Sequence, residues 1–161
     1  MIFFFFISKA QFPGISLNKY FTTTGSTLFY DGKPTSDGGF ILAGLDSIGG
    51  RFNFDYDINY KRIVGNAMLV KTDSAGNIIW KTVLPMETTP TTEIPRALCS
   101  VVQTDDGGYI AVGFTGLQHG NSKQVFIVKF SSSGTVLWQK QYWGSGEDLG
   151  YAIIRCNSGG Y

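Results

Sequence analysis

One segment of the chain has the residue spacing of a calcium-binding loop, in which oxygen-bearing side chains alternate with other residues. Asp55, Asp57 and Asn59 stand two positions apart, like the first ligands of a helix–loop–helix calcium site. Such a loop has glycine at its sixth position and a bidentate glutamate at its twelfth. Here Tyr60 and Asn66 occupy those positions, so we interpret the segment as a solvated surface loop rather than a metal site.

The other side chains that could carry catalysis have no partner at a useful spacing. His119 is the only histidine, and no second histidine or cysteine pair stands at the spacing of a zinc site or a catalytic triad. Glu147 and Asp148 are adjacent carboxylates, but neighbours in an extended chain point to opposite faces and cannot readily flank one substrate bond. No glycine-rich phosphate loop opens a helix, so nucleotide chemistry is not indicated. We therefore predict no catalytic, cofactor-binding or metal-binding residues and no cofactor.

A long-period repeat organises the chain. An Asp-Gly-Gly block over residues 37–44 recurs over 106–113, and a related block begins again at 158–161. A second block, residues 66–81, matches residues 124–139. A repeat of this kind is typical of architectures built from stacked supersecondary units.

The spacings of the repeated residues define the length of one unit. Trp80 and Trp138 are 58 positions apart, whereas the glycine pairs that begin at Gly38, Gly107 and Gly159 are separated by 69 and then 52 positions. A unit of 52 residues explains all three values if the first unit carries insertions of 11 and 6 residues. Insertions of this kind are tolerated in the loops of a repeat fold.

Each unit has the pattern of four short strands. In the second unit these are about 96–103, 109–114, 125–130 and 135–142, and no segment shows a sustained helical period. Asp106-Gly107 is the signal of a two-residue hairpin turn, because glycine supplies the positive φ of such a turn. The third strand is apolar at nearly every position, which indicates that both of its faces are covered. Four-stranded antiparallel units stacked around an axis are the blades of a β-propeller, so we predict an all-β, incomplete propeller.

The repeat also accounts for most of the remaining candidate residues. Trp80 and Trp138 recur at one repeat position, which favours packing between units over ligand stacking. The aspartates of the turns, which are Asp37, Asp105 and Asp106, are expected to accept hydrogen bonds from nearby backbone N–H groups. Cys99 and Cys156 fall at different depths of equivalent strands, so we expect core thiols rather than a disulfide.

The repeated residues also carry a family resemblance. The segments Gly144 to Asp148, Thr104 to Gly113 and Val128-Lys129, together with Gly134 and Trp138, resemble the bacterial and archaeal cell-surface β-propeller repeat proteins. These are distant structural relatives of the quinoprotein-type propellers. The resemblance covers residues 16–161; it implies the fold and a surface location but no particular activity.

The repeat divides the chain into parts. Residues 1–10 have the pattern of a truncated signal peptide, with an apolar run that ends before Ser8-Lys9-Ala10, and the alternative is a buried first strand. Residues 11–161 are interpreted as a partial propeller. It comprises the last strand of one blade, two full blades at about 27–85 and 96–142, and the first strand of a further blade at 150–161. Either the rest of a longer chain or several chains together would complete the ring, and we favour the longer chain.

The composition excludes some function classes. Thirteen basic and 12 acidic residues give a net charge of +1, which provides no electrostatic footprint for nucleic acid. The apolar run at the N-terminus is too short to span a membrane. We predict a non-catalytic, secreted or cell-surface scaffold or binding module for an unknown protein or glycan. The alternatives are a fragment of a propeller enzyme, such as a quinoprotein-like dehydrogenase or a polysaccharide-active enzyme, and a degenerate reading frame with no separate role.

Overall fold

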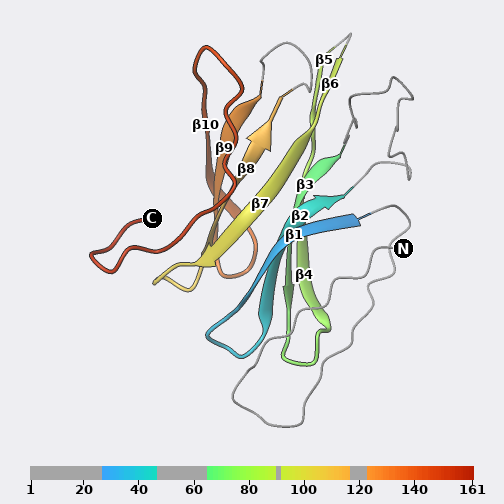
Figure 1. The fold of residues 1–161 in the computed structure, drawn as a ribbon. Helices are drawn as coiled ribbons and strands as arrows, with labels where there is room; N and C mark the ends of the chain where they lie inside the picture. Colours follow the sequence, from blue (N-terminus) through green and yellow to red (C-terminus); the bar gives the residue numbers. More distant parts are fainter. Residues whose placement is uncertain (1–26, 47–64, 90–91, 117–122) are drawn as a thin grey trace.

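The computed structural model describes residues 27–46, 65–89, 92–116 and 123–161. These residues form two four-stranded antiparallel sheets and one short hairpin, and none of them is helical. The first sheet contains, in this order, β1 (Thr27–Pro34), β2 (Phe40–Asp46), β3 (Asn66–Thr72) and β4 (Ile78–Leu84). The second contains β7 (Arg96–Gln103), β8 (Tyr109–Thr115), β9 (Gln124–Phe130) and β10 (Val136–Tyr142). Between the sheets in the sequence comes the hairpin of β5 (Glu87–Thr89) and β6 (Thr92–Ile94), which lies at one end of the sheets (Figure 1).

The all-β prediction is confirmed for these residues, and so is the four-stranded antiparallel unit. Each strand of the second sheet begins and ends within one residue of its predicted bounds. Neighbours in each sheet are also neighbours in the sequence, so every pair of strands closes as a hairpin or a simple meander. This topology fits propeller blades; their closure into a ring stays a prediction.

The short turns have one common construction. Residues 35–39, 73–77, 104–108 and 131–135 each join two strands with five residues. In every case the first residue's N–H donates to the carbonyl of the fifth, and the fourth residue's N–H donates to the carbonyl of the first. The fourth residue is a glycine with positive φ, for example 77° at Gly107. The predicted positive φ is therefore confirmed, but the connection is five residues long rather than a two-residue turn.

Burial follows the position of a strand in its sheet. The central strands β2 and β8 are buried on both faces over most of their length, as is β3. In β9, by contrast, buried Phe126, Val128 and Phe130 alternate with partly exposed residues. The prediction that the third strand is covered on both faces is therefore correct for β3 and only partly correct for β9. The reason is that the first sheet covers only one face of β9, since strand side chains alternate between faces.

A close backbone contact joins the first two strands of each sheet. A Cβ atom at Gly44 would lie 2.0 Å from the carbonyl oxygen of Leu28, and one at Gly113 would lie 1.9 Å from that of Ala97. Only glycine fits at these two positions. Directly beside the contact, β1 and β7 each carry a bulge, between Phe29 and Asp31 in β1 and at the equivalent point of β7. The bulges therefore occur where the two backbones lie closest.

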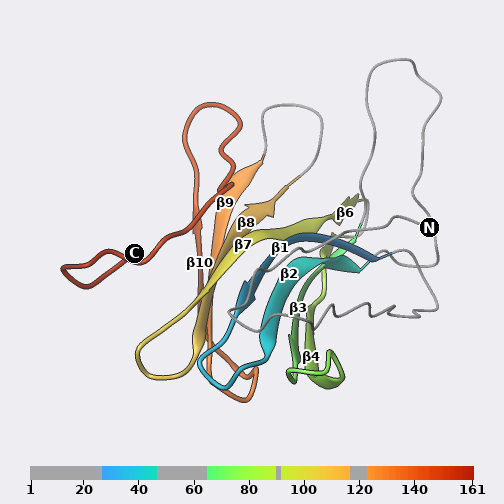
Figure 2. The same ribbon diagram turned by 60° about the horizontal axis from the view of Figure 1, so that its bottom comes forward.

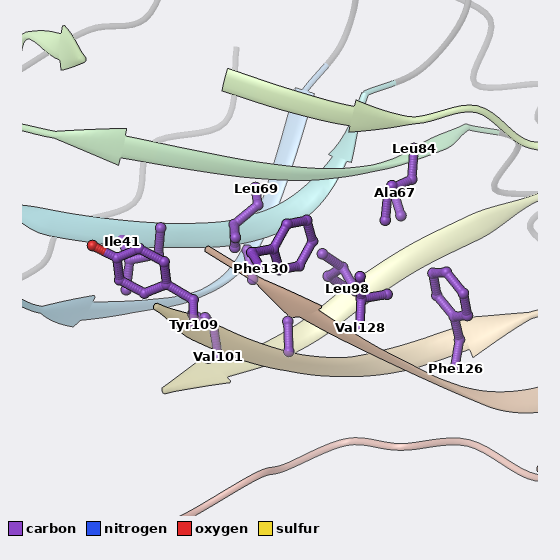
Figure 3. Packing of buried hydrophobic residues seen from close by; sticks show 12 residues of the cluster. Ile41, Ala67, Leu69, Leu84, Leu98, Val101, Tyr109, Phe126, Val128 and Phe130 are labelled. Atoms are coloured by element: carbon purple, nitrogen blue, oxygen red, sulfur yellow. The ribbon is translucent and has the colours of Figure 1, made fainter. Parts of the chain in front are cut away.

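The two sheets pack face to face around one core (Figure 2). Strand β7 lies against β1, β2 and β3 of the first sheet. The core cluster combines small and branched residues of the first sheet with larger residues of the second (Figure 3). Its buried members are Ile41, Ala43, Ala67, Leu69, Leu84, Leu98, Val101, Tyr109, Ala111, Phe126, Val128 and Phe130. The sheets are therefore held together mainly by burial of apolar surface, at about 25 cal/mol per Å².

Residues 143–161 form no strand in this structure. The sequence predicts the first strand of a further blade over residues 150–161, and that strand is not observed. A strand is defined by pairing with a neighbour, and no described residue pairs with this segment as a β-ladder. The segment instead runs along the second sheet and then away from it (Figure 1). Its assignment to a further blade stays a prediction.

Replacing Gly113 by alanine tests the close contact between β7 and β8. The added Cβ would collide with the carbonyl oxygen of Ala97, so we expect the free energy of unfolding to fall by about 1–3 kcal/mol. The measurement is urea unfolding followed by circular dichroism. Gly146→Ala is the matched control, because a Cβ there has nothing within 4 Å. Equal stability of the two variants would contradict the contact.

Candidate functional site

The most polar cluster of the first sheet lies at its β1–β2 turn. The ammonium of Lys71, in β3, lies 2.8 Å from Oδ2 of Asp37 and also donates to the carbonyl of Thr72 at 2.8 Å. The hydroxyl of Thr35 and the N–H of Gly39 donate to Oδ1 of Asp37 at 2.5 and 3.1 Å. The turn is therefore joined to the third strand through a single carboxylate.

The second sheet repeats this cluster at the equivalent residues. Lys129, in β9, donates to Oδ1 of Asp106 at 2.8 Å and to the hydroxyl of Thr104 at 2.6 Å. Oδ1 of Asp106 also accepts hydrogen bonds from the Thr104 hydroxyl and, at 3.0 Å, from the N–H of Gly108. We call each of these two groups, Thr35–Asp37–Lys71 and Thr104–Asp106–Lys129, a turn clasp.

The electrostatics of the turn clasps favour structure over proton transfer. The Lys71 side chain is only 4% exposed, whereas that of Asp37 is 56% exposed. Hydrogen bonds from the lysine, the threonine hydroxyl and the glycine N–H hold the pKa of Asp37 and of Asp106 well below the usual range. Both carboxylates are therefore ionised at neutral pH, which rules out a general-acid role there, and their lowered pKa makes them weak bases. The predicted role of Asp37 and Asp106 in accepting backbone hydrogen bonds is confirmed.

Asp105 behaves differently from the aspartate that follows it. It forms an ion pair with Arg155, and both side chains are largely exposed. Such a pair contributes little to stability, since solvent screens it. The prediction that Asp105 accepts a backbone hydrogen bond of its turn therefore finds no support among the described contacts.

Trp80 joins the two sheets. Its indole N–H donates to the carbonyl of Ser132 at 3.2 Å, and its ring meets the ring of Tyr109 edge to face, with centroids 5.8 Å apart. The ring also covers Gly134, where an added Cβ would lie 2.7 Å from it. Beside it, the hydroxyl of Thr82 donates to the carbonyl of Gly134 at 2.7 Å. The predicted packing of Trp80 between units is therefore confirmed.

Trp138 occupies the same repeat position but has different surroundings. It is 41% exposed, and its contact is the ammonium of Lys140, 5.6 Å from the ring centroid. The prediction of a packed tryptophan is wrong for Trp138. The second sheet covers Trp80 of β4, but in the described structure no further sheet covers Trp138 of β10.

The carboxylate of Asp31 links the two sheets. Oδ2 of Asp31, which follows the bulge in β1, accepts hydrogen bonds from the hydroxyl of Ser100 at 2.8 Å and the N–H of Val101 at 3.1 Å, both in β7. Lys33 approaches its other oxygen at 3.0 Å. Burial alone would raise the pKa of Asp31, but the hydrogen bonds outweigh burial and lower it. The Asp31 carboxylate therefore also has a structural role, which is to join the two sheets.

Arg96 forms the polar centre at the opposite end of the second sheet. Its guanidinium is buried over the ring of Phe126, 5.0 Å from the centroid, and donates to the carbonyl of Pro85 at 3.2 Å. It also pairs with Glu87 of β5. Oε1 of Glu87 accepts a further hydrogen bond, at 3.3 Å, from the amide of Gln141 in β10. The β5–β6 hairpin is thus tied to both outer strands of the second sheet.

The remaining predicted residues are not brought together. Glu147 pairs with Lys123 at 3.0 Å, whereas Asp148 accepts a hydrogen bond from the N–H of Gly144. Cys99 and Cys156 are free thiols. Burial raises the pKa of the Cys99 thiol to about 11. Cys156 is exposed, so the prediction of a core thiol is wrong there.

Some predictions fall on other parts of the chain. The calcium-like loop at Asp55, Asp57 and Asn59, together with His119 and residues 1–10, lies outside the described residues. Among the residues that are described, no group of three or more histidine, cysteine, aspartate or glutamate side chains is arranged to hold a metal ion. The same residues include no helix that is long and apolar enough to cross a membrane.

Sequence reasoning missed the lysines of the turn clasps and the aspartate that links the sheets. The lysines had a signal, because Val70-Lys71 and Val128-Lys129 recur at one repeat position within an apolar strand. A buried lysine needs a partner, so a search for a recurring acid would have found Asp37 and Asp106. Asp31 had no such signal, since its equivalent in the second sheet is Ser100.

The contrast between the two tryptophans can be tested by truncation. Trp80→Ala removes a ring packed between the sheets and its hydrogen bond to Ser132, so we expect a loss of about 3 kcal/mol in the free energy of unfolding. Trp138→Ala, the matched variant, should cost less than about 1 kcal/mol. Urea unfolding monitored by circular dichroism measures both. A larger loss for Trp138 would contradict the assigned packing.

The turn clasps predict a specific pH dependence. Because folding lowers the pKa of Asp37 and Asp106, their stabilising contribution is complete above about pH 4, the ordinary aspartate pKa, and is lost as the pH falls further. The double variant Asp37→Asn, Asp106→Asn should therefore have a lower urea midpoint than the parent at pH 7. The difference should be constant down to about pH 5 and should shrink below pH 4. Asp105→Asn is the control, and a difference that grew in acid would contradict the model of ionised clasps.

Comparison with known proteins adds no identity to these observations. No protein-family model matches the chain, and no curated protein is significantly similar to it. The features of the chain that bear on function are the charged groups of the turn clasps, the buried guanidinium of Arg96 and the exposed aromatic residues.

Proposed function

We propose that the chain is part of a non-catalytic β-propeller scaffold, secreted or held at the cell surface, that binds a glycan or a protein. The binding surface lies at the end of the sheets that carries the β5–β6 hairpin. The proposal combines the resemblance to cell-surface propeller repeats with the distribution of turns, charges and aromatic side chains over the two ends of the sheets.

The difference between the two ends of the sheets is the observation that carries the proposal. At one end, all four turns have five residues and the same backbone hydrogen bonds. At the other end, the connections have unequal lengths: residues 47–65, 85–95 and 116–123. Binding residues are commonly found on variable loops that a regular scaffold holds in place. The uniform end therefore supports structure, and the variable end is the better candidate for recognition.

The side chains at the variable end suit recognition of a sugar. Tyr142 and Trp143 follow one another at the end of β10, and Trp143 is 70% exposed. The amide of Gln141 and the carboxylate of Glu87 lie beside this end of the strand, joined by a hydrogen bond. Exposed aromatic rings next to planar polar groups can stack on a sugar ring and bond its hydroxyls.

The charged groups argue against catalysis within the described residues. Lys71 and Lys129 are engaged with Asp37 and Asp106 in the turn clasps, and Asp31 is engaged between the sheets. A general acid or base needs a pKa near the working pH, but the pKa of each of these carboxyls is lowered. The alternative, a fragment of a propeller enzyme, has no specific observation in its favour.

A glycan-binding assay with a matched pair of variants tests the proposal. We expect the protein to bind at least one polysaccharide of an immobilised panel, and Trp143→Ala to weaken that binding at least about tenfold, since truncating an aromatic residue at the centre of a binding surface costs about 2 kcal/mol or more. Tyr151→Ala is the control, because Tyr151 is equally exposed but lies on another segment. Both variants should keep the parental melting temperature.

Two results would contradict the proposal, and a third would reject only the choice of a glycan as ligand. If Trp143→Ala and Tyr151→Ala lost binding equally, the binding surface would not lie at the end of β10. Release of reducing ends from the polysaccharides, or reduction of a dye acceptor after addition of a quinone cofactor with calcium, would favour the enzyme alternative. Binding to purified extracellular proteins and to none of the glycans would reject the sugar as ligand.

A further inference from the structure

We propose that residues 148–161 form an acceptor edge for one additional antiparallel strand, which enters directly after Tyr161 and carries glycine at its fourth position. We call this segment the acceptor edge. The inference goes beyond the proposed function, because it concerns assembly and requires neither a ligand nor a closed ring.

The acceptor edge begins with the same backbone contact as β7. At the start of β7, the N–H of Arg96 donates to the carbonyl of Gly65, just before β3, at 3.0 Å. At the start of the acceptor edge, the N–H of Asp148 donates to the carbonyl of Lys123, just before β9, also at 3.0 Å. Asp148 follows Arg96 by 52 positions, the length of one repeat. The edge therefore approaches the second sheet as β7 approaches the first.

The side-chain packing of β7 recurs in the acceptor edge, but the large and small residues change places. Leu98 of β7 shares a buried cluster with Ala43 and Ala67 of the first sheet. One repeat later, Gly150 lies on Val112 and Val125, where an added Cβ would lie 2.2 and 3.3 Å from their methyl carbons. A large residue clustered with two alanines is thus replaced by glycine against two valines, which keeps the summed side-chain volume about the same.

The far end of the acceptor edge also repeats the contacts of β7. The side chain of Gln103, at the end of β7, accepts a hydrogen bond from the N–H of Ser36 in the turn of the preceding sheet, at 2.8 Å. The equivalent residue of the edge is Arg155, which pairs with Asp105 in the turn of the second sheet. Contacts at the start, middle and end of the edge therefore match those of β7.

The turn that follows is already shaped as a hairpin turn. The N–H of Cys156 donates to the carbonyl of Gly160 at 3.0 Å, and that of Gly159 donates to the carbonyl of Cys156 at 3.1 Å. These bonds match those of residues 104–108, which lead from β7 into β8. Gly159 has a φ of 87°, close to the 77° of Gly107. Gly160 also has a positive φ, of 86°, which differs from its equivalents Gly39 and Gly108.

The register of β7 with β8 defines the strand that would fit. Gln103 pairs with Tyr109, Val102 with Ile110 and Leu98 with Gly113. One repeat later, Arg155 would pair with Tyr161, and Ile154 with the first residue that follows it. The fourth residue would face Gly150 and meet the carbonyl of Leu149. In both existing sheets a glycine occupies this position because a Cβ would collide with the equivalent carbonyl.

The acceptor edge exposes the side chains that such a strand would cover. Ile154 is 72% exposed and Tyr151 is 71% exposed, whereas Val102, the equivalent of Ile154, is partly buried beside β8. An unpaired, apolar edge is a template for pairing with another strand. Because the turn at 156–160 directs the chain back along the edge, the occupant is the strand that directly follows this turn.

Extending the protein at Tyr161 tests the proposal. The full chain is fused to a copy of residues 110–142, which supplies three further strands, or to a copy of residues 110–115 alone. The N–H groups of Asp148 and Gly150 already donate to the carbonyls of Lys123 and Gly113. We therefore expect hydrogen exchange to slow at least about 100-fold at the backbone amides of residues 148–155 that face the added strand, because these amides become paired. The matched variant carries valine in place of the glycine copied from Gly113, and its amides should exchange as fast as those of the parent.

The existing sheets provide the internal standard for this measurement. If residues 96–142 keep their own protection while residues 148–155 gain none in either extension, the proposal is wrong. Equal protection by the glycine and valine extensions would also overturn it, since the strand would then pair in another register. Should the long extension fail to fold, the six-residue extension gives the same readout.

Discussion

The structure depends first on one backbone contact, the approach of the central glycine of each sheet to a carbonyl of the strand before it. At Gly44 and Gly113 there is no room for a Cβ. The bulges of β1 and β7 lie beside this contact, and a bulge increases the local twist of a strand. A twisted first strand can lie across three strands of the neighbouring sheet, as β7 lies against β1, β2 and β3. The glycine thus connects sheet geometry to sheet stacking.

Once the sheets are stacked, most of the polar chemistry is used to hold them in register. Asp31 bonds to β7, Trp80 bonds to Ser132, and the turn clasps fix each turn to its third strand. The contacts of Asp31 and Trp80 join the two sheets and therefore cannot form before the sheets meet, whereas each turn clasp lies within one sheet. A carboxylate engaged in this way is poorly suited to acid–base catalysis, because a change in its protonation state would lower the stability of the fold. The recurring positions of the two sheets therefore serve the structure, and we propose that recognition falls to positions that do not recur.

The strands and turns could be predicted from the sequence because they depend on local patterns. Alternating apolar runs and the positive φ of Gly107 are local properties, and the packing of Trp80 followed from its recurrence. The pairing of Lys71 with Asp37 joins residues 34 positions apart, which local periodicity does not describe. The exposure of Trp138 and of Cys156 could not be predicted either, because recurrence indicates a position in a unit but not whether a neighbouring unit covers it.

The contact of β7 with the first sheet and the contact of residues 148–161 with the second sheet use side chains of different sizes. This difference specifies which segment packs on which sheet. Leu98 shares a buried cluster with Ala43 and Ala67, whereas Gly150 lies against Val112 and Val125. Exchanging the partners would place leucine against valines and glycine against alanines, so that one contact would be overpacked and the other would leave a cavity. Either defect costs about 1–3 kcal/mol or more. Units that share one backbone plan are therefore not interchangeable, and the sizes of a few interfacial side chains are sufficient to distinguish the correct neighbour from an incorrect one.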